Sequence, residues 1–328
     1  MAAAIPIRVS HSQAGLRPVD PARDLKAITR LIELGFGPEL DPLGWRTLRR
    51  MQRLARRNPW AHLLVGPVTG LDGFVWVEDG AVVGNLSLRR AVPYSRGGWM
   101  IGNVVVAPEY RGRGIGRQLV EMALTTATSQ QARWIGLEVR SDNRPARQLY
   151  ESLGFEPVGE MEHLLRPAEP WPTPPPLQPG WQRSGPTDNV RWALLAEKAY
   201  PRLQREVLEI RPGAYNFGGW ERTLELWFHR QRETAWLHGE RRPSLAVQTH
   251  TDRAARFHTW ELLVNPRTGE TGCQAAIARA LHVMSPRQVW PVIVSVPATS
   301  LLVSVLQTWG FQRHRLLMQM RYSERGNV

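Results

Sequence analysis

The chain has 328 residues, of which 42% are hydrophobic and 22% charged, a globular composition that excludes a disordered chain. This length is enough for two domains of ordinary size. The single cysteine, Cys273, excludes an internal disulfide framework and fits a reducing, cytoplasmic location. The first residues, MAAAIPIRVSHSQ, lack a charged start followed by a long apolar core, so we expect no signal peptide.

The net charge of +13 is carried by arginine, because Lys26 and Lys198 are the only lysines. A basic surface can attract nucleic acid, anionic lipid or a polyanionic small molecule. The arginines form no block of five or six residues. A functional basic patch and a general use of arginine in place of lysine therefore both stay open.

The first predicted elements are a helix at 24–34 and two strands at 73–77 and 81–88, joined by the turn Glu78-Asp79-Gly80. A third strand is predicted at 99–106, a helix at 114–128, a strand at 134–139 and a helix at 144–153. Gly154 ends that last helix, and Phe155 begins another strand. This order indicates a mixed α/β fold in which one helix crosses between two parallel strands.

A proline-rich segment divides the chain. Seven of the fifteen residues in RPAEPWPTPPPLQPG, at 166–180, are proline, which favours an extended spacer. We therefore predict a domain at 1–167, a linker at 168–180 and a second domain at 181–328.

The second half repeats the order of the first, with strands at 234–237, 244–249 and 259–264, a helix at 273–281, a strand at 289–296 and a helix at 300–309. Pro108 and Pro266 lie 158 positions apart, as do Gly114 and Gly272. This spacing predicts an internal duplication. The apolar run at 289–306 approaches the length of a membrane span. Two prolines interrupt it, so we interpret it as a buried strand, a turn and a helix rather than a membrane segment.

The strongest motif is VVVAPEYRGRGIGRQLV at 104–120, where a strand leads through a glycine- and arginine-rich loop into a helix. Glycines allow close approach of the backbone, and the free N–H groups of a first helical turn attract anions such as a pyrophosphate. Arg111, Arg113 and Arg117 add positive charge. A Walker loop and a dinucleotide fingerprint both fit poorly, because Arg117 stands where either would need another residue. A simple surface turn is the alternative.

A second motif follows at 137–155, LEVRSDNRPARQLYESLGF. Together the two motifs resemble the GNAT N-acetyltransferase superfamily, in which an Arg-x-x-Gly-x-Gly loop binds the pyrophosphate of acetyl-CoA and an Asn…Ala…Leu-Tyr-Glu…Gly-Phe run follows. The resemblance covers roughly residues 16–167. It implies an α/β fold of two tandem GNAT-like domains and an acyltransferase that uses acetyl-CoA as co-substrate and no metal.

The resemblance also implies roles for individual residues. Asn143 would hydrogen-bond the pantetheine, with capping of the following helix as the alternative. Tyr150 would protonate the departing thiolate, with a core aromatic as the alternative. The residues expected to bind acetyl-CoA are Val104, Val105, Val106, Arg111, Gly112, Arg113, Gly114, Ile115, Gly116 and Asn143.

The general base is less clear, because Ile101-Gly102-Asn103 carries no carboxylate where many family members have one. Glu138 on the neighbouring strand is our candidate, and a structural carboxylate is the alternative. Glu109 is interpreted as a solvated charge. Glu33, Glu39 and Asp41 are candidates for the acceptor side of the cleft by family analogy.

The second half departs from these motifs. At the 158 offset, Arg111 corresponds to Gly269 and Gly116 to Gln274, and at an offset of 156 Tyr150 corresponds to Leu306. We therefore expect this half to be degenerate and to bind no acetyl-CoA in the usual way. Cys273 is expected to be a small buried hydrophobe.

The leading hypothesis is an N-acetyltransferase that acetylates a small-molecule or peptide amine. A protein N-terminal acetyltransferase is one alternative, because its motif run looks similar. An acyl-CoA-binding or nucleic-acid-associated module without turnover is another, although nucleic acid and membrane are not the expected partners. The acceptor and the oligomeric state are not indicated by the sequence.

Overall fold

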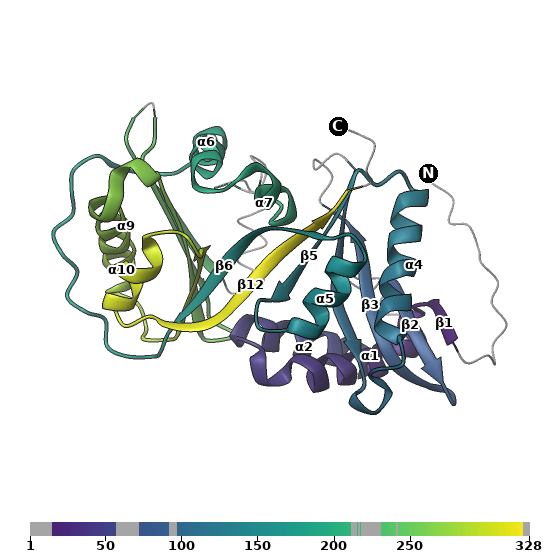
Figure 1. The fold of residues 1–328 in the computed structure, drawn as a ribbon. Coiled ribbons are helices and arrows are strands. Elements are labelled where there is room, and N and C mark those ends of the chain that lie inside the picture. Colours follow the sequence, from purple (N-terminus) through teal and green to yellow (C-terminus); the bar gives the residue numbers. More distant parts are fainter. Residues whose placement is uncertain are drawn as a thin grey trace. The chain divides into compact units, whose positions relative to one another are not determined.

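The computed structural model describes residues 15–56, 72–91, 97–210, 215, 217, 231–240 and 242–323 (Figure 1). Two compact units divide the chain between Ile135 and Gly136. The first holds the described residues up to Ile135 together with Ser323, and the second holds Gly136–Tyr322. Each unit is described by itself.

The first unit is an antiparallel sheet with helices packed on it. Its strands run in the order β1-β2-β3-β4, and α1 and α4 both contact β3 and β4. The elements are β1 (Gly15–Pro18), α1 (Pro21–Phe36), α2 (Pro42–Arg56), β2 (Gly73–Glu78), β3 (Ala81–Arg90), β4 (Gly98–Val106) and α4 (Ile115–Ser129), with 3-10 turns at Gly37–Glu39 and Pro108–Tyr110.

Local sequence explains these elements. Asp79 and Gly80 both take positive φ angles, 49° and 75°, which gives the tight hairpin turn predicted between β2 and β3. The Asp20 side chain accepts a hydrogen bond from Ala22 N, and Pro21 occupies the first turn of α1. Apolar residues of α1 then pack with Leu48 of α2 against β2.

The second unit contains a longer mixed sheet in the order β5-β12-β6-β11-β10-β9-β8-β7. Its elements are β5 (Trp134–Arg140, which begins at the end of the first unit), α5 (Arg144–Ser152), β6 (Glu156–Arg166), β7 (Trp181–Arg183), α6 (Asn189–Ala199), α7 (Arg202–Val207), β8 (Gln231–His238), β9 (Leu245–Asp252), β10 (Phe257–Val264), α9 (Gly269–Met284), β11 (Val292–Pro297), α10 (Leu302–Thr308) and β12 (Gln312–Tyr322), with a 3-10 turn at Pro266–Thr268.

Two strands from distant parts of the sequence lie side by side in this sheet. β6 pairs with β12 on one edge and with β11 on the other, so the last strand of the first sequence half is held by strands of the second (Figure 1). Met161 stands opposite Leu317, and these two residues are themselves 156 positions apart. β6 and β12 are thus counterparts in the two repeats, and they pair antiparallel about a local twofold axis.

The duplication is visible in the order of elements. The series β2-β3-β4-α4-β5-α5-β6 is repeated as β8-β9-β10-α9-β11-α10-β12, and β12 begins and ends 156 positions after β6. The predicted mixed α/β fold with two tandem repeats is confirmed. The contact division follows strand pairing rather than the linker, so the domain limits at 167 and 181 stay a prediction.

The apolar run at 289–306 forms β11, a turn and α10, as predicted. Their side chains join a core with α9 and β10. Across the described ranges, no helix has both the length and the apolar character needed to cross a membrane.

Candidate functional site

The site begins at an irregularity in β4. Asn85 of β3 pairs with Val105, but Ser87 pairs with Gly102, so Asn103 and Val104 together oppose Leu86. Asn103 has a φ of 51°, in the left-handed region. This is a β-bulge, which bends a strand and re-aims its backbone groups. The bulge lies directly before the pyrophosphate motif.

Buried polar side chains hold the bulge in place. The Asn85 amide, 1% exposed, donates to Asn103 O at 3.0 Å, and the Asn103 amide donates to Ser87 Oγ at 3.1 Å. An amide that spans the irregular pair replaces ladder hydrogen bonds that a bulge disrupts. The bulge is therefore a fixed feature of β4.

The loop between β4 and α4 depends on two glycines. Gly112 and Gly114 have φ angles of 78° and 77°, and no other group lies within 4 Å of where a Cβ would stand. The first fact explains why glycine is needed, because other residues rarely adopt this conformation. The second leaves the backbone open to a ligand on that side.

The N-terminus of α4 has N–H groups that precede the helical hydrogen-bond ladder. The first helical hydrogen bond runs from Gln118 N to Gly114 O, so Ile115 N and Gly116 N stand before it. No side chain caps this end, since the N-cap residue is Gly114. α4 packs on the sheet through the buried side chains of Ile115 and Leu119, which lie close to Gly84 of β3. The result is an anion-binding helix end.

The loop arginines are partly occupied by protein groups. Arg111 Nε donates to Val106 O at 3.1 Å, which ties the loop to the end of β4. Arg113 lies 3.2 Å from Glu78 and over the ring of Tyr110, and Arg117 pairs with Glu121. These pairs are exposed and weak, so the guanidinium groups could still turn towards an anion.

In the second unit, Asn143 caps α5. Its Oδ1 accepts a hydrogen bond from Ala146 N at 3.2 Å, which confirms the capping role predicted as the alternative. The residue is exposed, and its amide NH₂ is not used by the cap. The cap therefore uses only the carbonyl oxygen of this side chain.

Tyr150 is the one buried residue of α5, with 6% of its surface exposed. Its ring packs edge-to-face on Phe155, at a centroid distance of 5.9 Å. Burial raises the pKa of Tyr150 to about 12, so its hydroxyl stays protonated at neutral pH. Tyr150 is thus both a core aromatic and a protonated donor.

Glu138 lies on β5, and it is the exposed residue of a strand that is otherwise mostly buried. Desolvation raises the pKa of its carboxyl, and a hydrogen bond from Gln319 Nε2 at 2.9 Å opposes that rise. Gln319 is fully buried and in turn accepts from Gln204 at 3.0 Å. A carboxylate with a raised pKa is a better proton acceptor near neutral pH.

The acidic candidates near α1 have different surroundings. Asp41 is buried and accepts from Gly44 N at 2.7 Å, so it caps α2, a helix that the sequence analysis did not predict. Glu33 accepts from Gln52 at 2.8 Å. Glu39 ends the 3-10 turn after α1, and Glu109 lies exposed in the turn before the arginine loop. Within the described residues no three His, Cys, Asp or Glu side chains form a metal-binding group.

The second half keeps an uncapped helix N-terminus and one positive-φ glycine, Gly269, but lacks the arginines, the second positive-φ glycine and the bulge. α9 begins at Gly269, the counterpart of Arg111, whereas α4 begins at Ile115. The counterpart of the loop is therefore coiled into the first turn of α9, where Glu270 adds a negative charge. β10 pairs with β9 in unbroken register, so it has no bulge.

Sequence analysis missed Asn85 and Gln319, whose roles depend on strand pairing. Neither residue belongs to a motif, and Gln319 lies 181 positions from Glu138. The only available signal was a polar residue among apolar ones, in the predicted strand at 81–88 for Asn85 and in the run LLMQM at 316–320 for Gln319.

Comparison with known proteins agrees with this geometry. The profile of the Acetyltransferase (GNAT) family matches residues 45–155. Mycothiol acetyltransferase of Mycolicibacterium vanbaalenii is 31% identical over 47% of this chain and 48% of its own length. N-alpha-acetyltransferase RimI of Mycobacterium tuberculosis is 38% identical over 24% of this chain and 46% of its own length. The chain thus spans about half the length of these relatives.

Solved structures match over nearly the whole chain. A GCN5-related N-acetyltransferase from Sphaerobacter thermophilus has a TM-score of 0.63 at 17% identity, covering 95% of this chain and 97% of that one. A tandem GNAT protein from the clavulanic acid biosynthesis pathway has a TM-score of 0.59 at 15% identity, covering 95% and 100%. These likenesses concern the fold. Residues 45–155 thus match the GNAT acetyltransferase family, and nearly the whole chain shares its fold with solved structures described as GNAT proteins.

Proposed function

We propose that this protein is an N-acetyltransferase that moves the acetyl group of acetyl-CoA to an amine by direct attack. The observation that carries the proposal is the β4 bulge followed by two positive-φ glycines and an uncapped helix N-terminus. A pyrophosphate requires donors that approach closely without side chains in the way. The residues at 111–116 fit that requirement.

Each part of the motif then has one task. The N–H groups at the start of α4 hold the pyrophosphate, and backbone groups of Val104, Val105 and Val106 align the pantetheine and the acetyl carbonyl. The amide NH₂ of Asn143 hydrogen-bonds the pantetheine while its oxygen caps α5. These tasks are proposed from the family resemblance together with the local geometry of each residue.

The chemistry needs a proton acceptor and a proton donor. An amine with a pKa of ~10 is only about 0.1% neutral at pH 7, so it must lose a proton before it attacks. We assign that proton to Glu138, whose raised pKa suits a base. As the C–N bond forms and the C–S bond breaks, Tyr150 protonates the departing thiolate, since its own pKa of about 12 keeps it protonated.

The acceptor is proposed only as a class. A small-molecule amine and a peptide α-amine both remain candidates, because the relatives include a mycothiol acetyltransferase and an N-alpha-acetyltransferase. A nucleic-acid-associated module without turnover is the competing proposal, supported by the +13 charge.

Thiol release from acetyl-CoA decides between these proposals. The full chain is incubated with a panel of small amines and N-terminal peptides, and free CoA is measured. We expect release with at least one amine, and Tyr150→Phe should abolish it. The matched control is Tyr215→Phe, which removes another buried tyrosine hydroxyl and should leave release intact. Salt-sensitive binding of duplex DNA without release from any amine would favour the competing proposal.

A further inference from the structure

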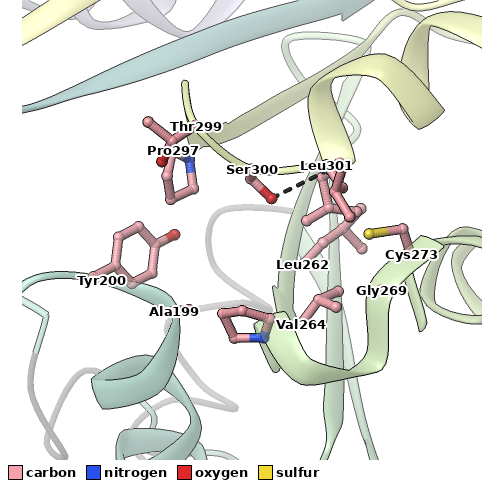
Figure 2. Close-up of a pocket in the computed structure, with 12 residues that line it drawn as sticks. Ala199, Tyr200, Leu262, Val264, Gly269, Cys273, Pro297, Thr299, Ser300 and Leu301 are labelled. Atoms are coloured by element: carbon pink, nitrogen blue, oxygen red, sulfur yellow. Dashed lines mark hydrogen bonds between the residues drawn. The ribbon is translucent and has the colours of Figure 1, made fainter. Parts of the chain in front are cut away.

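A cavity of about 230 Å³ lies in the second unit, and its lining includes none of the residues assigned above to acetyl-CoA or to catalysis (Figure 2). It is bounded by Leu262 and Val264 of β10 and by Pro297 at the end of β11. Cys273 of α9, Ser300 before α10 and Tyr200 after α6 complete its wall. The elements that surround it are therefore well separated in the sequence.

The cavity opens where two parallel strands part. β10 and β11 pair only from His258 opposite Val292 to Trp260 opposite Val294. β10 nevertheless continues to Val264, while β11 continues to Pro297 along β6. Side chains and the turn before α10 line the space between the two strand ends, as Figure 2 shows.

The wall is apolar with a few hydroxyl groups. Burial raises the pKa of Tyr200, so its hydroxyl is a permanent donor, and Figure 2 shows that oxygen pointing into the cavity. Ser300 Oγ accepts from Leu302 N at 3.2 Å and keeps its own hydrogen to donate. Among the described lining residues none is Asp, Glu, Lys, Arg or His. A charged ligand would lose its hydration here without gaining an oppositely charged side chain from the described wall.

We propose that this cavity binds an uncharged small molecule with an aliphatic body and one hydrogen-bond acceptor, such as a short-chain amide or alcohol. The aliphatic part lies against Leu262, Val264 and Pro297, and the acceptor faces the hydroxyl of Tyr200. None of the described lining residues belongs to the acetyl-CoA motif. The absence of positive charge in its described wall distinguishes it chemically from that motif.

The single cysteine of the chain reports on the cavity. Cys273 is only 2% exposed, yet its side chain contributes to the wall. A small neutral thiol reagent, methyl methanethiosulfonate, should modify it faster than the cationic trimethylammonium analogue. Hexanamide at millimolar concentration should slow the neutral reaction at least fivefold, measured by mass spectrometry of the full chain. Hexanoate, which has the same chain length but is charged, should not protect.

Two variants test the proposed contact. Tyr200→Phe should reduce protection by hexanamide severalfold, whereas Tyr215→Phe, a buried tyrosine outside the described wall, should not. If Tyr200→Phe fails to fold, Ser300→Ala replaces it with the same expected direction. Equal protection by hexanoate, or no protection at saturating hexanamide, would overturn the proposal. Neither outcome depends on acetyl-CoA turnover, so a failure here leaves the proposed transferase activity untouched.

Discussion

The loop before α4 and its counterpart before α9 show how a repeated fold can keep its frame and lose a binding site. Both follow a strand that ends at a valine and a 3-10 turn that begins at a proline, 158 positions apart. The first then passes through a turn with two positive-φ glycines before α4 begins at Ile115, whereas α9 begins directly at Gly269. The two segments thus differ in the conformation of four residues, and we propose that only the first binds an anion.

The strands before the two loops, β4 and β10, also differ in backbone conformation. Asn103 takes a left-handed conformation in the bulge of β4, and its counterpart Glu261 lies in regular pairing within β10. Glu261 accepts a hydrogen bond from Tyr215 at 3.1 Å and is half-buried. The two strands thus differ in a local backbone irregularity that the sheet itself does not require.

The largest effect is expected at the proton donor. Tyr150→Phe removes one hydroxyl from a ring that packs on Phe155, so the fold should persist while turnover falls about 100-fold or more. Steady-state rates with saturating acetyl-CoA measure the loss. The affinity for acetyl-CoA, measured by calorimetry, should be unchanged. Turnover that survives the substitution would remove Tyr150 from the mechanism.

The second prediction concerns the cradle. Gly114→Ala places a methyl group on the open face of the loop and forces a positive φ on alanine, which costs about 1 kcal/mol. Acetyl-CoA affinity should fall about tenfold in calorimetry. Gly80→Ala, at nearly the same φ and equally open, controls for the backbone strain and should leave affinity intact.

The same experiment in the second half sharpens the comparison. Gly269→Ala, at a φ of 60° with open space around it, should not change acetyl-CoA affinity. Gly272 would be a poor choice, because a Cβ there would lie 2.0 Å from Thr268 Oγ1 and disturb packing. A drop in affinity for Gly269→Ala would contradict the view that the second half has lost the site.

A smaller effect is expected in the pH profile. Glu138 acts as a base only when ionised, so turnover should fall as pH drops through its raised pKa. Gln319→Leu removes the hydrogen bond that favours the carboxylate, so the acid limb should move to higher pH. Rates measured across pH test this. Glu138→Gln should lose the limb together with most of the activity, and an unchanged profile in both variants would show Glu138 to be structural.

The smallest effect is one of stability. Burial raises the pKa of Glu261 to about 7 from an ordinary 4.5, so the folded state holds a proton that the unfolded state releases. The stability contribution is therefore lost as pH rises from about 4.5 through 7, by about 3 kcal/mol. Glu261→Gln should flatten that part of the pH dependence in urea unfolding and leave turnover intact. A steeper dependence would contradict the assignment.

The sequence predicted the parts of this structure that depend on local patterns. The turn at Asp79-Gly80, the glycine loop and the end of α5 at Gly154 each follow from residues close together in the chain. The fold class followed from their order. The two-domain limits and the residue roles in the site remain predictions.

What the sequence could not indicate depends on distant partners. β12 lies between β5 and β6 in the sheet, so each of the two counterpart strands pairs with the other. The alternation of residues along a strand does not indicate which strand becomes its partner. The β4 bulge requires Asn85 and Ser87 of another strand. α9 begins at Gly269, four residues before the predicted start at 273.

The most direct test is a crystal structure of the full chain soaked with acetyl-CoA. The account predicts one molecule per chain, with its diphosphate on the amide hydrogens at 112–116. A diphosphate bound instead at 269–274, or none at the start of α4, would contradict it.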